Sequence, residues 1–390
     1  MEAERPRTSD KHKSSGIYSA MKIAIIGTRG IPNNYGGFEQ LAQYLSIRLG
    51  DKGHDIYVYN SHNHPYRQST WHNVNLIHCY DPEKRLGTAG QFIYDLNCIR
   101  DSRKRKFDVI LALGYTSFSL WAKLLPRDTL TVINMDGLEW KRTKYSKSVQ
   151  RFLRYAERLA VKHCDRHIAD SSAIQTYLFE KYGIPSKYIA YGAEIHHNED
   201  ESLLPSFGVT SGDYFMVMAR MEPENNIEMI VEGFNASRSD KKLLVLGNTD
   251  NSFGQSIVRR FSGDSRISFP GAIYDARKIH TLKIFSSLYF HGHSVGGTNP
   301  SLLEAMASRA LVAAHNNPFN KAILGEDAYY FSESKDVTAL VERTVDQENR
   351  EGMIEKNLQK IREHFNWETI TDEYEQFLKT SYREFNAKKS

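Results

Sequence analysis

Short apolar segments rich in β-branched residues alternate with amphipathic helical segments along this chain, and the alternation begins twice. In the first half the expected strands are residues 22–27, 55–60, 74–78, 108–113, 130–134, 166–169 and 188–191. In the second half they are residues 214–219, 243–247, 267–269, 287–291 and 311–314. Apolar strands joined by helices are typical of parallel sheets covered on both faces. The sequence therefore predicts an α/β protein with two doubly wound, Rossmann-like halves that face a cleft.

A polar, acidic stretch at residues 194–212 separates the two halves and is expected to be a linker. It divides the chain into an N-terminal domain, residues 21–193, and a C-terminal domain, residues 213–366, both within the usual range of about 100–200 residues. A last helix over residues 367–390 is expected to cross back to the first domain. Residues 1–20 lack the apolar core of a secretory signal, so a disordered tail is expected there.

Composition and charge narrow the possible functions. The chain has 51 Lys and Arg against 47 Asp and Glu, so its net charge is only +4, whereas proteins that coat nucleic acid are far more basic. No run of about 18 apolar residues occurs, and no membrane-spanning helix is expected. The number of cysteines is odd, and none of them belongs to a C-x-x-C pair; they are Cys79, Cys98 and Cys164. This argues against a disulfide framework and against a zinc site. A reducing cytoplasm is the expected compartment.

A glycine-rich loop follows the first expected strand. It begins with GTRGIP at residues 27–32, which lacks the G-x-G-x-x-G spacing of a dinucleotide fingerprint. Gly36 and Gly37 then open a helix whose amino end can hold an anion. Arg29 can add a two-pronged contact to a phosphate. The alternative is a tight connection that binds no ligand.

A second motif, NMDGLEWKR at residues 134–142, comes directly after an expected strand and so lies at a carboxyl end of the sheet. Asp136 or Glu139 can act as a base or hold sugar hydroxyls. Trp140 offers a flat face to a sugar or a lipid. The alternative is a closed loop in which Asp136 satisfies backbone donors and Glu139 pairs with Arg142.

Residues 141–162 form a basic segment with one acid, Glu157. Its cations are Lys141, Arg142, Lys144, Lys147, Arg151, Arg154, Arg158 and Lys162. Val149, Phe152 and Leu159 belong to an apolar stripe on the same segment. Such a basic amphipathic segment can lie on anionic lipid headgroups. The alternatives are a helix with a solvated cationic face and a nucleic-acid surface, although the chain contains no recognised nucleic-acid module.

Two motifs in the second half point to an anionic ligand. In the first, Arg220 ends a strand and a helix begins at about residue 226, so a permanent cation and a helix dipole lie together. A diphosphate suits this arrangement, and the alternative is an ion pair between Arg220 and Glu224.

The second motif covers residues 291–304, where a strand ends in a Gly-Gly loop and the chain re-enters a helix. Ser301 or Asn299 can cap that helix, and its first amides form an anion site. Glu304 lies one turn in and can accept two ribose hydroxyls. The two histidines of this motif have no third ligand nearby in sequence, so no metal is expected.

Five motifs in order give the chain a resemblance to the family 4 glycosyltransferases of the GT-B fold over residues 21–385. They are GTRGIP, YGGFE, NMDGLEWKR, ENN and HSVGGTNPSLLEA. In that family an arginine and, five positions on, a lysine bind the donor diphosphate, and the second Glu of an E-x7-E motif binds the ribose. Arg220 and Glu304 match, whereas Asn225 stands at the lysine position and Gly296 at the first Glu. The combination resembles a branch that includes bacterial rhamnosyltransferases of capsule and surface-polysaccharide assembly.

The resemblance implies a retaining, metal-independent transfer of a deoxysugar from a dTDP donor to a lipid-linked sugar, at the inner face of the cell membrane and without a cofactor. The implied catalytic residues are Asp136, Glu139 and Arg220. The implied donor contacts are Gly36, Gly37, Arg220, Asn225, His293, Gly297, Thr298, Asn299, Ser301 and Glu304. The implied acceptor or membrane contacts are Arg29, Trp140, Lys141, Arg142 and Arg151. Two other functions stay open: a catalytically degenerate sugar-nucleotide-binding subunit and a GT-B sugar-nucleotide epimerase.

Overall fold

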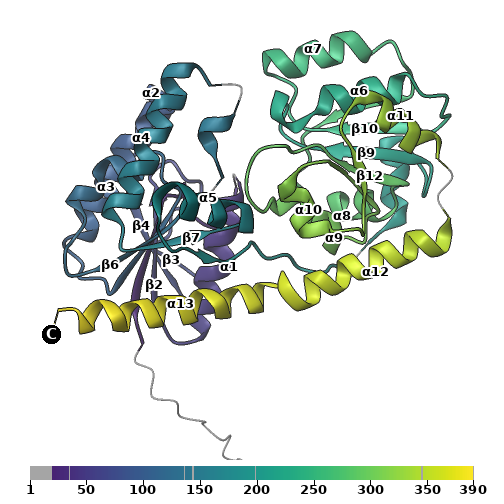
Figure 1. Ribbon diagram of the computed structural model, residues 1–390. Helices are drawn as coiled ribbons and strands as arrows, with labels where there is room; N and C mark the ends of the chain where they lie inside the picture. Colours follow the sequence, from purple (N-terminus) through teal and green to yellow (C-terminus); the bar gives the residue numbers. More distant parts are fainter. Residues whose placement is uncertain are drawn as a thin grey trace, which may run out of the picture.

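The computed structural model describes residues 20–34, 36–135, 137–142, 145–197, 199–343 and 346–389. Two α/β lobes lie side by side, and two consecutive helices at the end of the chain run along both of them (Figure 1). Each lobe is built on its own sheet. The expected fold class, two Rossmann-like parallel-sheet halves, is confirmed. The expected N-terminal tail lies outside the described residues except for Ala20.

The sheet of the N-terminal half has eight strands among the described residues, in the order β3-β4-β2-β1-β5-β6-β7-β8. The strands are β1 (Lys22–Ile26), β2 (Asp55–Ser61), β3 (Thr70–Trp71), β4 (Val74–Cys79), β5 (Val109–Leu113), β6 (Leu130–Asn134), β7 (Arg166–Ala169) and β8 (Lys187–Tyr188). The short β3 pairs antiparallel with β4, and the other described neighbours pair parallel. The direction of winding reverses between β1 and β5, which is where ligands bind in open sheets of this kind.

The sheet of the C-terminal half has six parallel strands among the described residues, in the order β11-β10-β9-β12-β13-β14. They are β9 (Tyr214–Met218), β10 (Lys242–Leu246), β11 (Ile267–Gly271), β12 (Leu288–His291), β13 (Val312–His315) and β14 (Tyr329–Phe331). Here the winding reverses between β9 and β12. The loops that follow these two strands are those of the two anion motifs, so the topology puts both motifs at one place.

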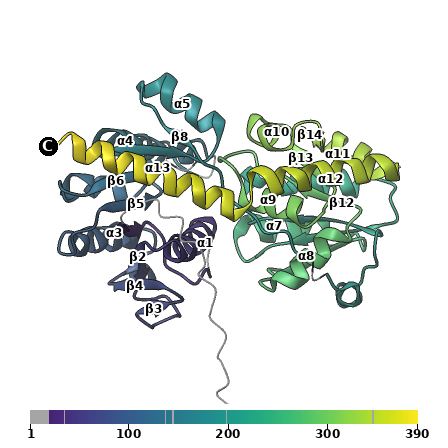
Figure 2. The same ribbon diagram turned by 90° about the horizontal axis from the view of Figure 1, so that it is seen from below.

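Helices cover both faces of the N-terminal sheet and flank the C-terminal one (Figures 1 and 2). In the N-terminal half they are α1 (Gly37–Asp51), α2 (Glu83–Leu86), α3 (Ala89–Ser102), η1 (Phe118–Leu124), η2 (Glu139–Lys141), α4 (Lys147–His163) and α5 (Ser172–Tyr182). In the rest of the chain they are η3 (Glu201–Phe207), η4 (Pro223–Asn225), α6 (Ile227–Asn235), α7 (Ser252–Phe261), α8 (Ala276–Ile284), α9 (Pro300–Ala307), α10 (Pro318–Leu324), α11 (Ser334–Glu342), α12 (Gln347–His364) and α13 (Trp367–Ala387). Every residue of β5 and β6 is buried, which explains why their sequences are continuous apolar runs.

The last two helices connect the halves. α12 packs on α9 in the C-terminal half, and α13 runs across the N-terminal half against α1 and β6 (Figure 2). Tyr374 of α13 accepts a 3.1 Å hydrogen bond from the Asn134 amide at the end of β6. At the crossing point, the Trp367 ring stacks on Tyr44 of α1 with centroids 4.5 Å apart. These buried contacts attach the end of the chain to the first sheet.

Two segments differ in detail from what the sequence predicts. The strand expected at residues 188–191 is formed instead by Lys187–Tyr188, because it pairs with β7 only at those two positions. The stretch at 194–212, expected to be a linker, contains the 3-10 helix η3, which buries Leu204 and packs against α8. Leu204 and Val209 are buried, so this polar segment is packed against the C-terminal half.

Candidate functional site

The two halves meet through loops at the carboxyl ends of their central strands. A Cβ atom added to Gly37, the first residue of α1, would lie 3.3 Å from Pro300, the first residue of α9. A Cβ added to Gly137 would lie 2.7 Å from Gly296. The amino ends of two helices therefore lie against each other where the two halves meet, and two glycine loops touch beside them.

The loop that leads into α9 is docked on the N-terminal half. Asn299 caps the helix by accepting a 3.0 Å hydrogen bond from the Ser301 amide, and the Ser301 hydroxyl in turn donates to Asn299. Of the two expected capping residues, Asn299 is the one that caps. Thr298 donates its hydroxyl to the carbonyl of Asp170 after β7, and a Cβ on Gly297 would overlap the Asp170 carboxylate. Only a glycine allows this approach.

Glu304 lies in α9 at the cleft, held from two sides. Its Oε2 atom lies 3.3 Å from the ammonium group of Lys283 in α8, and its Oε1 atom accepts a 3.0 Å hydrogen bond from Gln40 of α1 in the opposite half. The Lys283 side chain is 0% exposed, whereas that of Glu304 is 30% exposed. Glu304 is therefore a supported carboxylate with an open side.

Arg220 lies exposed just past β9, and no partner of its guanidinium is found in the part of the chain that the structure describes. Its backbone carbonyl accepts a 2.7 Å hydrogen bond from the Asn225 amide, whose side chain is turned inward. The expected alternative, an Arg220–Glu224 pair, does not form among these residues. Glu224 instead lies 3.4 Å from Arg142 of the N-terminal half. Arg220 is thus a cation available to a ligand.

The two histidines at the end of β12 and just after it, His291 and His293, are neutral. Burial lowers the pKa of His293 to about 3, with help from the charges of Arg220 and Arg142. Burial also lowers the pKa of His291 well below its usual value, and the rings stack with centroids 4.4 Å apart. Among the described residues, no group of three or more His, Cys, Asp or Glu is placed to hold a metal ion.

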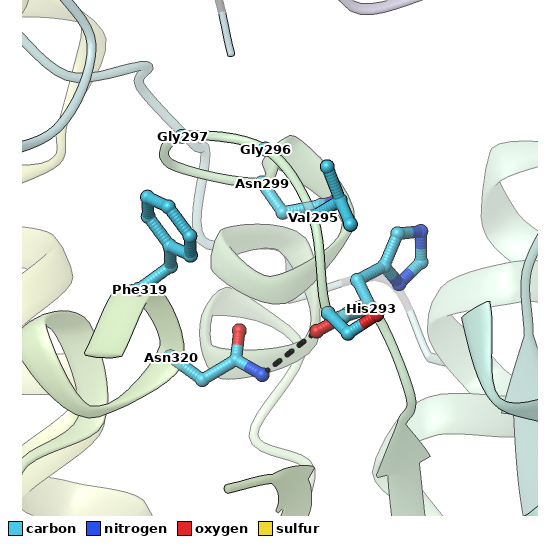
Figure 3. Close-up of a pocket in the computed structure, with 8 residues that line it drawn as sticks. His293, Val295, Gly296, Gly297, Asn299, Phe319 and Asn320 are labelled. Atoms are coloured by element: carbon cyan, nitrogen blue, oxygen red, sulfur yellow. Dashed lines mark hydrogen bonds between the residues drawn. The ribbon is translucent and has the colours of Figure 1, made fainter. Parts of the chain in front are cut away.

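A small pocket lies on the side of this loop that faces α10. Its lining includes His293, Gly297, Asn299, Phe319 and Asn320 (Figure 3). The Asn320 amide donates a 3.1 Å hydrogen bond to the His293 carbonyl, while the His293 ring points away from Phe319 (Figure 3). A cavity of about 10 Å³ holds no more than a water molecule, so the space between this loop and α10 is too small for a substrate.

In the motif after β6, Glu139 and Arg142 form an ion pair of 2.6 Å, which is the alternative that the sequence left open. Because Arg142 also reaches Glu224, this pair bridges the cleft. Asp136, the other acid of the motif, lies outside the described residues.

The loop after β1 is stabilised within its own half. Arg29 binds Glu83 of α2 with two hydrogen bonds of 2.9 and 2.6 Å, and this pairing lowers the pKa of Glu83 against the opposing effect of burial. The Arg29 amide donates to the buried carboxylate of Glu39 at 2.8 Å. Gly36 is the N-cap of α1. The backbone of Gly36 and Gly37, rather than the Arg29 side chain, is the part of this loop that faces the cleft.

Trp140 is covered on its ring and hydrogen-bonded at its nitrogen. Its indole donates to Glu157 at 3.1 Å, and the charged groups of Arg154 and Lys181 lie 4.7 and 5.4 Å from the ring centroid. Glu157 is 1% exposed and also accepts hydrogen bonds from Tyr177, Tyr182 and Lys181. The Trp140 face is thus occupied by protein cations, and the single acid of the basic segment is removed from the surface.

The outer face of α4 is consequently cationic. The exposed cations of this helix are Lys147, Arg151, Arg154, Arg158 and Lys162. Val149 and Tyr155 are 38% and 55% exposed among them. Lys141, just before the helix, is also exposed. No described helix is long and apolar enough to cross a membrane.

Solved structures share this architecture. HepE from Anabaena in complex with UDP is 16% identical, with a TM-score of 0.72 over 92% of this chain and 100% of that chain. Sucrose-phosphate synthase from Thermosynechococcus elongatus is 16% identical, with a TM-score of 0.74 over 94% and 99%. A glycosyltransferase from Rickettsia africae is 12% identical, with a TM-score of 0.68 over 93% and 99%. The chain has the GT-B fold.

Comparison of the amino-acid sequence with known families gives one match. The profile of a family described as "Domain of unknown function (DUF1972)" matches residues 20–194, which is the N-terminal half of this GT-B chain. No curated protein sequence matches the chain.

Several residues of the cleft were not expected from sequence. Lys283 and Gln40 carry no local signal, because each becomes part of the site only through contact with Glu304. Asp170 is different: it follows β7 directly, and an acid just after a buried strand is a signal that the sequence offered. Glu224 was considered only as a partner of Arg220.

Proposed function

We propose that this protein is a glycosyltransferase that moves a sugar from a nucleoside diphosphate to a lipid-linked saccharide. The observation that carries the proposal is one wall of the GT-B cleft. There, the exposed cation of Arg220, the capped amino end of α9 and the supported carboxylate of Glu304 lie around the loop after β12. A cation and the positive end of a helix dipole suit a diphosphate, and a carboxylate suits ribose hydroxyls. The first amides of α9 are already bonded to Asn299, so the helix acts through its dipole.

The chemistry follows from the leaving group. As the bond between the sugar and the diphosphate breaks, negative charge grows on the diphosphate oxygens. Arg220 and the positive end of the α9 dipole stabilise that charge without reorganisation, because they are already in place. The acceptor hydroxyl attacks the anomeric carbon on the face that the nucleoside diphosphate leaves, and its proton passes to the departing diphosphate oxygen. This gives a retaining transfer that, in this proposal, needs no metal ion. Asp136 and Glu139 lie on the acceptor side in this proposal.

The identity of the substrates rests on the resemblance of the five motifs to surface-polysaccharide rhamnosyltransferases. We take dTDP-rhamnose as the donor and a lipid-diphosphate-linked sugar as the acceptor. UDP and UDP-glucose are bound by HepE, which shares the fold, so uridine donors belong in the same test.

A donor panel tests the proposal. The full chain is mixed with dTDP-rhamnose, UDP-glucose, UDP-galactose, UDP-GlcNAc or GDP-mannose and a short lipid-diphosphate-glucose acceptor, in the presence of a chelator, and products are read by mass spectrometry. We expect transfer from dTDP-rhamnose alone. Transfer from another donor contradicts the rhamnose assignment and keeps the reaction class. Donor binding without transfer favours the degenerate subunit, and an altered sugar nucleotide without acceptor favours an epimerase.

The acceptor places the enzyme at a membrane surface. The cationic face of α4 belongs to the acceptor half, and each basic residue near an anionic bilayer contributes about 1 kcal/mol to binding. We expect the protein to sediment with vesicles that contain phosphatidylglycerol, and to be released by salt. Reversing two exposed charges, Arg151→Glu with Lys162→Glu, should weaken this binding at least about ten-fold.

The matched control reverses two exposed charges of the other half, Arg238→Glu with Arg259→Glu. Both double variants change the net charge by the same amount, so only the position of the charges differs. Equal loss in the two variants, or binding that ignores lipid charge and salt, argues against a membrane role for α4.

A further inference from the structure

We propose that Lys283 is a positioning residue for the donor site, which holds the Glu304 carboxylate ionised and oriented toward the ribose of a bound nucleoside diphosphate. The inference rests on the proposed function, because it takes Glu304 as the ribose ligand. Lys283 itself does not touch the donor; it acts through Glu304.

The geometry places the lysine beneath the carboxylate. Lys283 comes from α8 and Glu304 from α9, and their charged atoms lie 3.3 Å apart. The Lys283 side chain is completely buried, so it is enclosed by protein, whereas Glu304 keeps an exposed side at the cleft. A lysine is almost never fully buried unless it is paired. A buried cation is therefore paired with one oxygen of Glu304, the carboxylate that this proposal places at the ribose.

The opposite oxygen of Glu304 is held differently. Gln40 donates to it at 3.0 Å, but Gln40 belongs to α1 of the other half, so this contact depends on how the two halves are placed. The contact with Lys283 lies within the C-terminal half and does not depend on the N-terminal half. Of the two partners, Lys283 is the one that can prepare Glu304 before the donor arrives.

Among the titratable groups that face Glu304, Lys283 supplies the charge that pairs with the carboxylate. Burial lowers the pKa of the Lys283 ammonium, and the charge of Glu304 opposes that shift. Burial lowers the pKa of His280 in α8 to about 4, so this ring, which lies tilted against His196, is neutral near pH 7. Tyr44 of α1 and Tyr289 of β12 also face the carboxylate. Burial raises the pKa of both phenols, helped by the charge of Glu194 at Tyr44 and of Glu304 at Tyr289, so both stay neutral.

The electrostatic balance gives a test by pH. Burial alone raises the pKa of Glu304, but the Lys283 charge and the hydrogen bonds from Gln40 and Lys283 outweigh it, and the net shift is downward. Wild-type Glu304 thus stays ionised in mildly acidic solution. In Lys283→Met the burial effect is opposed only by weaker contacts, so the pKa of Glu304 rises and the carboxylate is protonated at higher pH than in the wild type.

The experiment measures dissociation constants for dTDP and UDP by calorimetry between about pH 5.5 and pH 8. The full-chain variants are Lys283→Met, Glu304→Gln and the double variant. Each value is divided by the wild-type value at the same pH, so that protonation of the nucleotide cancels. We expect Glu304→Gln to weaken binding by a nearly constant factor. Lys283→Met should approach the wild type at high pH and the Glu304→Gln variant at low pH, a change of about ten-fold.

The matched control is Lys278→Met, which removes another lysine of α8. Among the described residues, the side chains that bind the Glu304 carboxylate are those of Gln40 and Lys283, not Lys278. Its ratio should stay near one at every pH. In the double variant, loss of Lys283 should add nothing to Glu304→Gln, because the two changes remove one interaction. A ratio for Lys283→Met that is flat with pH, or additive effects in the double variant, overturns the proposal.

The remaining outcomes are also decisive. If Glu304→Gln leaves dTDP and UDP affinity unchanged, the assignment of the donor site fails, whatever Lys283 does. Circular dichroism and thermal unfolding establish that each variant is folded, and Lys283→Gln replaces Lys283→Met if the latter is not. If both lysine variants unfold while Glu304→Gln remains folded, Lys283 is a core residue of the C-terminal half and the proposal is wrong.

Discussion

Replacing Arg220 with alanine is expected to reduce sugar transfer by about 10³-fold or more. The guanidinium is exposed at the cleft and has no partner among the described residues, so its charge is available to the leaving diphosphate. Asn225 at the expected lysine position is turned inward on the Arg220 carbonyl, and no second side-chain cation follows on η4. The effect should therefore fall on kcat more than on KM, because the charge develops as the bond breaks.

The fold should survive this change, since an exposed side chain is removed and the hydrogen bond from Asn225 goes to the Arg220 backbone. Steady-state kinetics with the best donor of the panel, together with thermal unfolding, provide the measurement. Arg259→Ala, an exposed arginine of α7 in the same half, is the control and should retain full activity. Turnover of the Arg220→Ala protein within a few-fold of the wild type would remove Arg220 from the mechanism.

Gly297→Ala is expected to lower kcat/KM by about 100-fold, because a displacement of about 1 Å at a catalytic site has that effect. In the closed cleft the new methyl group would overlap the carboxylate of Asp170, which is 1% exposed and has little room to move. The loop must then shift away from the N-terminal half, and the hydrogen bond of Thr298 to the Asp170 carbonyl is lost with it. The helix α9 and its cap should be misplaced relative to the acceptor half.

Kinetics of Gly297→Ala are compared with those of Gly263→Ala, a glycine with no atom near the added Cβ. Both changes alter the unfolded chain in the same way, so the comparison isolates the clash. Adding Asp170→Ala to Gly297→Ala removes the overlapping carboxylate and should restore part of the activity beyond the product of the single effects. Unchanged kcat/KM in Gly297→Ala would mean that the reaction does not need this closed contact.

Much of the architecture was determined by the sequence itself. The apolar runs that became β5 and β6 are buried along their whole length, and a strand in that environment has few alternatives. Arg220 and Asn299 stand where a strand ends and where a helix begins, so spacing alone placed them at the carboxyl edge of the second sheet. Positions of this kind depend on contacts within a few residues, and a sequence can express them directly.

Other features were decided only by tertiary structure. Whether Glu139 is free or paired depended on where Arg142 points, and Arg142 also reaches Glu224 across the cleft. Glu304 gained Lys283 from 21 positions away and Gln40 from 264 positions away. Such pairs form because the packing of separate helices brings them together, and no local pattern of side chains records that packing.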